Sequence, residues 1–175
     1  MGIRVYLYVR LLIDVMKRIS VTEFSLFFRK QFIFISFFFF SEREKEVCMY
    51  ARDDSPGVFY IRKAGIVTAL KLLHISGEVG CVWNGRSKWG CSDPNNIATV
   101  ITDDQNNVVF PEDRNYPYTI DGFGSNSPEL MLNFSIPLVV TAGQEFRVWY
   151  SEDLHGTDTD NYPGPTCMKV IPYFG

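Results

Sequence analysis

The sequence predicts an all-β protein, an antiparallel β-sandwich of the jelly-roll type, preceded by a non-globular N-terminal segment. From Gly57 onward, apolar and polar residues alternate in short runs, and turn residues separate the runs at short intervals. Antiparallel sheets with one solvated face give this alternation. Short strands with this spacing are typical of sandwiches and jelly rolls, so we expect roughly seven to nine of them and no helix.

The first half of this region contains three expected strand units. "GVFYIRKAG" (57–65) is interpreted as a strand that ends in an Ala-Gly turn. "IVTALKLLHISG" (66–77) fits both a strand and a helix, and we interpret it as a strand because its neighbours are strands. "NNIATVITDD" (95–104) and "NNVVF" (106–110) flank the turn at 104–107, so they predict a hairpin.

The second half continues with "YPYTI" (116–120) as a short strand, and "CMKVIPYF" (167–174) closes the chain. In "ELMLNFSI" the period of two places four apolar residues on one face, and in "EFRVWYS" it places polar residues and one tryptophan opposite the apolar face. The expected inward residues are Leu130, Leu132, Phe134, Ile136, Phe146, Val148 and Tyr150; the expected outward residues of the later strand are Glu145, Arg147, Trp149 and Ser151.

Residues 1–50 have a different character, and we assign them to a hydrophobic leader, with the sandwich domain at 51–175. The apolar run "FIFISFFFF" (32–40) follows Arg29 and Lys30 and precedes the charged run "SEREKE". It is shorter than the about 20 apolar residues that span a membrane. Its basic–apolar–polar order resembles a secretory signal. Three interpretations stay open: a late or uncleaved signal or a membrane anchor through residues 24–40, a non-native leader, and a packed helix.

The charge pattern separates the two parts of the chain. The net charge is −3, but the residues from Gly57 onward hold 8 Lys and Arg against 13 Asp and Glu, a net charge of −5. An acidic body argues against nucleic acid as a partner, because phosphates require a basic face. No nucleophile elbow, zinc-protease motif or phosphate loop occurs in the sequence. The sequence therefore favours a binding protein over an enzyme.

Four cysteines and one glycosylation sequon indicate the secretory route. Asn84-Gly85 favours a two-residue hairpin turn, which places Cys81 opposite Lys88 and leaves Cys91 out of register. We therefore expect a disulfide between Cys91 and Cys167, with a Cys81–Cys91 bridge as the open alternative. The sequon at Asn133 lies on the expected outward face of its strand.

Several segments together resemble a module of uncharacterised secreted proteins of invertebrate animals. They are "KAGIVTALKLLHISG", "WGC", "TDDQNNVV", "GSNSPEL", "AGQEFRVWYSEDL" and "TCMKV". The resemblance covers residues 58–174 and implies a secreted β-sandwich that serves in the extracellular matrix or in recognition. It supplies no catalytic or binding residues, and residues 1–50 have no counterpart in it.

The loop between Ser151 and Pro165 is rich in acids and is our candidate calcium site. Calcium takes six to eight oxygen ligands, and a flexible acidic loop can supply several of them. The alternative is a solvated loop whose Asp, Asn, Gly and Pro residues only make turns. The candidate ligands are Glu152, Asp153, Asp158, Asp160 and Asn161.

Three tryptophans and Arg147 are candidate ligand-binding residues. Trp149 shares its expected face with Arg147, and a flat ring beside polar groups can stack on a sugar. The alternative is a ring that only covers the outer face, with Arg147 laid across it. Trp83 and Trp89 flank the Asn-Gly turn and are expected either to form a ligand rim or to pack in the turn.

These observations predict a secreted, non-enzymatic binding module whose partner is a glycan, with calcium ordering the loop at 151–165. The first alternative is a structural protein that binds an extracellular-matrix component and holds calcium or mineral weakly. The second is a small hydrolase that uses the acids between Glu152 and Asp160. A membrane is an expected partner only through the N-terminal segment, if the mature protein retains it.

Overall fold

A computed structural model describes residues 45–51, 55–80, 85–90, 93–154 and 164–175. Strands dominate these residues, and the predicted all-β sandwich is confirmed. One short helix, α3, follows the ninth strand, where the sequence predicted none. The elements are β1 Val47–Tyr50, β2 Gly57–Tyr60, β3 Gly65–Gly77, β4 Val79–Gly80, β5 Arg86–Ser87, β6 Thr99–Asp103, β7 Val108–Phe110, β8 Glu129–Val140, β9 Glu145–Tyr150, α3 Ser151–Leu154 and β10 Pro165–Phe174.

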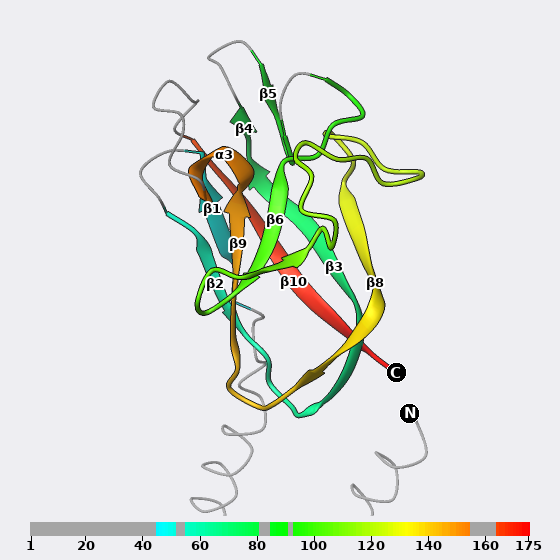
Figure 1. Cartoon of the computed structure of the whole chain (residues 1–175). Coiled ribbons are helices and arrows are strands. Elements are labelled where there is room, and N and C mark those ends of the chain that lie inside the picture. Colours follow the sequence, from blue (N-terminus) through cyan, green and yellow to red (C-terminus); the bar gives the residue numbers. More distant parts are fainter. Residues whose placement is uncertain (1–44, 52–54, 81–84, 91–92, 155–163) are drawn as a thin grey trace, which may run out of the picture. The chain divides into compact units, whose positions relative to one another are not determined.

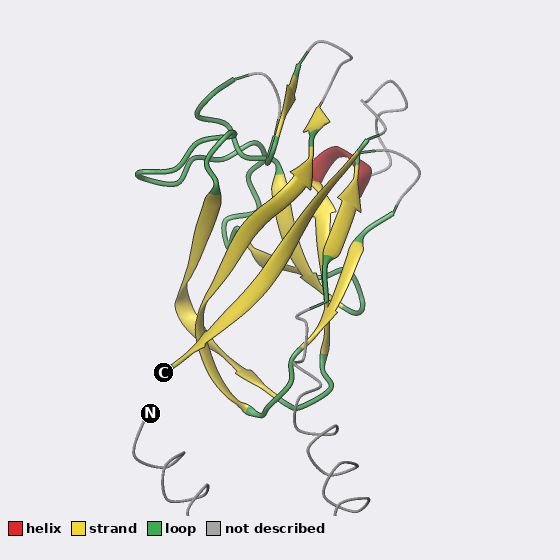
Figure 2. Cartoon of the chain, turned by 180° about the vertical axis from the view of Figure 1, so that it is seen from behind, coloured by secondary structure: helices red, strands yellow, loops and turns green. Residues whose placement is uncertain are grey.

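Two four-stranded antiparallel sheets lie face to face (Figures 1 and 2). The first has the order β1-β10-β3-β8, and the second has the order β2-β9-β6-β7. The short strands β4 and β5 pair separately at one end. The predicted hairpin of residues 95–110 is confirmed, because β6 pairs with β7 around the turn at 104–107. The strand predicted at 66–77 is confirmed as β3.

The core lies between the two sheets and contains the apolar face of each strand. From the first sheet it takes Leu72, Leu130 and Leu132, which are fully buried, and from the second it takes Val148 and Tyr150. The inward positions predicted for residues 130–134 and 146–150 are therefore confirmed. Alternation works here because each of these strands is covered by the opposite sheet on one face only.

Strand β8 breaks its alternation, and Ile136 is not in the core. Its pairing with β3 jumps from Asn133 opposite Ala69 to Leu138 opposite Val67, so β8 contains extra residues at this point. The irregularity turns Ile136 outward only locally, because Leu138 and Val140 beyond it pack against the core again while Val139 is exposed. Ile136 is 75% exposed, and the prediction that it shares the core face of Leu132 is wrong.

The stretch "YPYTI" is not a strand. Tyr118 and Ile120 form only isolated bridges, to Ile97 and Phe123 respectively. The Tyr118 hydroxyl instead donates a hydrogen bond to the Thr99 carbonyl oxygen at 2.5 Å, within the core. This segment is a loop that is fixed by side-chain burial rather than by a ladder of backbone bonds.

The β4–β5 hairpin forms, but its register differs from the predicted one. Val79 pairs with Ser87, and Gly80 pairs with Arg86. The register expected from a two-residue turn at Asn84-Gly85 is different. It would place Gly80 opposite Trp89, three residues beyond Arg86. The backbones approach closely here: a Cβ on Gly80 would lie 2.3 Å from the Gly85 carbonyl oxygen.

Strand β1 contributes the disulfide partner of the C-terminal strand. The bond joins Cys48 to Cys167, which are opposite each other in the β1–β10 ladder. The predicted Cys91–Cys167 pairing is therefore wrong. Cys48 was not expected to be the partner, because it lies in the part of the sequence assigned to the leader. The compact unit of the structure begins earlier, at Glu44. Cys81 and Cys91 lie outside the described residues.

Candidate functional site

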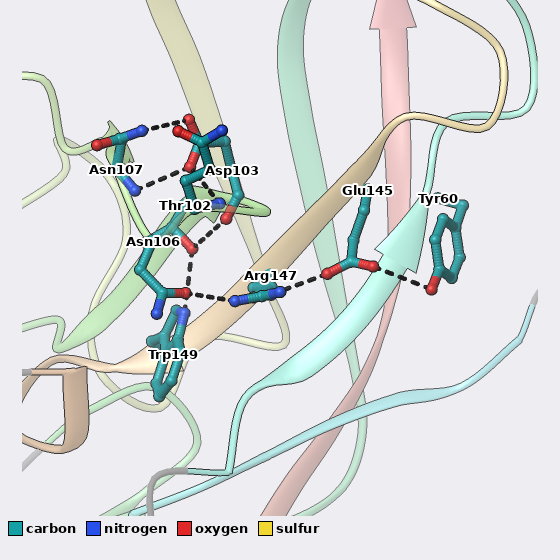
Figure 3. A network of polar contacts seen from close by, with 9 residues as sticks. Tyr60, Thr102, Asp103, Asn106, Asn107, Glu145, Arg147 and Trp149 are labelled. Atoms are coloured by element: carbon teal, nitrogen blue, oxygen red, sulfur yellow. Dashed lines mark hydrogen bonds and ion pairs between the residues drawn. The ribbon is translucent and has the colours of Figure 1, made fainter.

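A strip of polar side chains crosses the outer face of the second sheet (Figure 3). Arg147 donates from Nε to Glu145 Oε1 at 2.9 Å and from Nη1 to Asn106 Oδ1 at 2.7 Å. The other carboxylate oxygen of Glu145 accepts a hydrogen bond of 3.1 Å from the Tyr60 hydroxyl. That bond and the Glu145 charge raise the pKa of Tyr60 above its usual value. We call these four residues the polar strip.

Trp149 lies at the end of the polar strip but is buried, which disagrees with an accessible stacking ring and agrees with the alternative of a ring that only covers the outer face. It shares the face of Arg147, as expected, yet only 6% of it is exposed. Its Nε1 donates to the Thr102 hydroxyl oxygen at 3.0 Å, on the neighbouring strand β6 (Figure 3). The exposed ring of this face is Tyr60, at 55%.

The β6–β7 turn supports the polar strip from one side. The Asp103 carboxylate accepts hydrogen bonds from the backbone N–H of Gln105 and from both the N–H and the side-chain amide of Asn107. Burial acts to raise the pKa of Asp103, but these bonds and the Arg147 charge outweigh it and hold the pKa below its usual value. Asn106, with φ of 64°, then presents its amide oxygen to Arg147. These donors and acceptors satisfy one another, so the strip stabilises the sheet.

A second polar region lies among the loops that follow β5 and β7. Asn95 and residues Thr119–Gly124 surround an open hollow of about 520 Å³, which we call the loop hollow. Ile120 and Phe123 close a tight turn within it, and Gly122 at the tip has φ of 81°. This volume lies within the range typical of small-ligand sites, about 300–1,000 Å³.

Backbone hydrogen bonds hold the loop hollow in shape. Phe123 N–H donates to Ile120 O at 3.0 Å, and Ser125 N–H donates to Pro94 O at 2.8 Å. Gly124 packs so closely that a Cβ there would lie 2.3 Å from the Pro94 oxygen. The hollow is therefore preformed, which lowers the entropy that binding must overcome.

Trp89 supports the loop hollow from the protein interior and is not an exposed rim. Its ring is fully buried, and its Nε1 donates to the Ser127 carbonyl oxygen at 2.7 Å. It meets His74 edge to face, with ring centroids 5.7 Å apart. Of the two interpretations of Trp89, turn packing is the one that agrees with this burial. Trp83 lies outside the described residues.

The groups that line the loop hollow suit a neutral, hydroxyl-rich ligand. Asp121, Thr119 and Asn95 are exposed, and Phe123 is half-buried. Among the residues that the structure describes, the Asp121 carboxylate and the Thr119 hydroxyl bond to no other protein group, in contrast to the polar strip. A carboxylate and an amide can accept and donate hydrogen bonds to sugar hydroxyls, and a ring beside them can stack on a sugar face. The sequence did not indicate this hollow, because no strand pattern marks it.

The acidic loop is described only at its start. Glu152 and Asp153 lie on α3, and Asp153 is buried, with its Oδ2 accepting a hydrogen bond of 3.2 Å from the Ser55 N–H. The other candidate calcium ligands, Asp158, Asp160 and Asn161, lie outside the described residues. Within the described residues, the single cluster of potential metal ligands is Glu46 with the two disulfide sulfurs, which are not thiolates and cannot act as such ligands.

Comparison with known proteins places the sandwich in a family. No family model matches the chain, and no curated protein matches it significantly in sequence. Among solved structures, it is similar to AJLec from the sea anemone Anthopleura japonica, with a TM-score of 0.68 and 30% sequence identity over 75% of this chain and 93% of that one. The chain belongs to the AJLec family. The shared part amounts to about three quarters of this AJLec-family chain, close to the share that the Glu44–Gly175 unit occupies.

One further finding concerns membranes. No helix among the described residues of this AJLec-family chain is long and apolar enough to cross a bilayer.

Proposed function

We propose that the chain is a non-enzymatic carbohydrate-binding protein and that the loop hollow is its sugar site. The observation that carries the proposal is the relationship to AJLec, a lectin-like protein, over 93% of that chain. The loop hollow supports it because its preformed wall combines the exposed Asp121 carboxylate with the half-buried Phe123 ring. Recognition of sugar hydroxyls requires donors and acceptors that are not already hydrogen-bonded within the protein. The side chains of the polar strip already hydrogen-bond to one another.

Glycan-array binding, followed by calorimetry with the best sugar, tests the proposal. Asp121→Asn keeps the shape of the side chain and removes its charge, so affinity should fall about 10- to 100-fold if the carboxylate holds a sugar hydroxyl. Asp104→Asn is the matched control, since Asp104 is exposed on the β6–β7 turn, outside the loop hollow. Absence of any glycan binding by the folded protein would overturn the function.

The polar strip is the competing location for the sugar. Tyr60→Ala removes its exposed ring, and Arg147→Lys removes the fork that joins Glu145 to Asn106. If either change abolishes binding while Asp121→Asn has no effect, the sugar binds on the strip and the loop hollow is not the site. We expect both variants to bind within about twofold of wild type.

We also propose that calcium orders the loop at 151–165. The support is the density of acids there, which calcium would neutralise. Calcium should raise the melting temperature and EDTA should lower it, and the Asp158→Asn plus Asp160→Asn double variant should respond to neither. An unchanged calcium response in that variant contradicts the metal site. Calcium-dependent melting without glycan binding would favour the matrix-protein alternative.

Secretion is part of the same proposal. Asn133 is exposed on β8, which makes the sequon accessible to a glycosyltransferase. The protein purified from its natural source should carry a glycan at Asn133 and should start after the N-terminal apolar segment. Intact-mass analysis before and after glycosidase treatment tests both expectations, and an unglycosylated full-length chain would contradict them.

A further inference from the structure

An apolar groove runs along the side of the sandwich between β2 and the C-terminal half of β10. Its volume is about 470 Å³, which is comparable to sites for small ligands. Both sheets contribute walls to it, and the residues just after β2 complete it. The lining residues that the argument uses are Lys45, Phe59, Lys63, Val170, Pro172 and Phe174.

Among the described residues, two strand edges meet at the groove without a pairing strand. Strand β1 pairs with β10 only from Pro165 to Met168. Beyond Met168, β10 pairs with β3 on one side, and no described strand pairs with its other side. Strand β2 is likewise at the edge of its sheet, paired with β9 alone. Because β1 stops short of this part of β10, it leaves apolar side chains there uncovered. These side chains line the groove.

The chemistry of this edge disfavours another strand as the occupant. Pro172 lies in the half of β10 that β1 does not reach, and it has no backbone N–H to donate. Proline on an edge strand is a recognised means of preventing strand addition. A ligand that gains its affinity from apolar contact, rather than from backbone hydrogen bonds, fits the groove better.

The rim of the groove is cationic. Lys45, Arg62 and Lys63 line it, and no Asp or Glu is among its described lining residues. The Lys63 ammonium lies 4.2 Å from the centroid of the Phe174 ring, a cation–π contact that keeps the charge at the mouth. This positive rim stands out because the chain from Gly57 onward has a net charge of −5. The complementary ligand is apolar along its length and negative at one end.

We propose that the groove binds a fatty acid with an acyl chain of about 12 carbons or more. The acyl chain lies against Phe59 and Val170, and the carboxylate lies between the ammonium groups of Lys45 and Lys63. This site is separate from the loop hollow and does not depend on carbohydrate binding. It gives the protein a second ligand class, carried on the side of the sandwich rather than among its loops.

Isothermal titration of the native full-length protein with laurate, below its micelle concentration, tests the proposal. We expect saturable binding of one laurate per chain, with dodecanol binding at least about fivefold more weakly and dodecyltrimethylammonium more weakly still. Lys45→Glu plus Lys63→Glu should weaken laurate binding at least about tenfold. Each lost surface charge contact should lower the affinity for laurate about two- to fivefold, and the introduced carboxylates also repel the laurate carboxylate.

Arg86→Glu makes the same kind of charge change on β5, outside the groove, and should leave laurate affinity unchanged. Val170→Glu places a charge in the apolar wall and should abolish binding; retained glycan binding or a cooperative melt shows that this variant is folded. Laurate binding that is absent, or equal in the wild type and the Lys45→Glu plus Lys63→Glu variant, would overturn the proposal. Binding to phosphatidylserine vesicles without binding of free laurate would also overturn it, in favour of a membrane surface.

Discussion

Replacing both Cys48 and Cys167 by alanine tests how much the sandwich depends on the bond between its first and last strands. The two cysteines are opposite each other in the β1–β10 ladder, and the bond closes a loop with a sequence separation of 119. β1 has only four residues and one neighbouring strand, so few other contacts hold it. The bond therefore restrains an unfolded chain that is otherwise free over almost the whole domain.

The size of the effect follows from the length of that loop. Chain-entropy arguments give about 4.9 kcal/mol of stabilisation at 25 °C for a separation of 119. With an unfolding entropy of about 2.1 cal/mol/K per residue, the Glu44–Gly175 unit has about 280 cal/mol/K in total. Dividing the free energy by this entropy predicts a fall in melting temperature of about 15–20 °C.

Thermal melting by circular dichroism, with and without reductant, measures the change. Reductant should lower the melting temperature of the wild type by a similar amount and should lower that of the double variant much less. A peptide map of the non-reduced wild type should contain a fragment that links Cys48 to Cys167. A fall in melting temperature of less than about 3 °C, or a map that links Cys167 to Cys91, would refute the reasoning.

Two further predictions concern buried polar groups. Thr102→Val leaves the buried Trp149 Nε1 without its acceptor, so the free energy of unfolding should fall by about 1–3 kcal/mol in urea titration; a change within error would contradict the burial. Burial raises the pKa of Tyr118 far above its usual value. The contribution of Tyr118 to the free energy of unfolding is therefore complete below about pH 10, where its hydroxyl is protonated in the unfolded chain too. Above that pH, this contribution falls by about 1.4 kcal/mol per pH unit. Tyr118→Phe should remove this part of the alkaline loss in urea titrations from about pH 9 to pH 11.5, and equal slopes would contradict it.

The strand pattern of the sequence predicted the sheets well because alternation is a local property. In β9, each residue's side follows from its neighbours, and Phe146 and Val148 are buried as expected. Where the ladder is irregular, the pattern fails. In β8, the residues between Asn133 and Leu138 face only one residue of β3, between Ala69 and Val67. This mismatch depends on the partner strand, so the sequence of β8 alone does not reveal it.

The candidate site was predicted less well, because it depends on contacts distant in sequence. Trp149 is on the predicted face, but its burial depends on Thr102, which lies 47 positions earlier on a neighbouring strand. The loop hollow forms where Pro94 accepts a hydrogen bond from Ser125, between two loops without periodicity. The proposal that the partner is a glycan rests on the relationship to AJLec and not on any of the residues predicted to bind it.

The sequence by itself determined that this protein is a β-sandwich with an acidic body, because the period of two and the charge balance are properties of the sequence alone. The tertiary structure alone decided that Cys167 joins Cys48, that Trp89 and Trp149 are buried, and that an apolar groove with a cationic rim opens beside β10. The physical reason is that pairing, burial and cavities depend on which strands become neighbours, and in this fold the first strand lies beside the last.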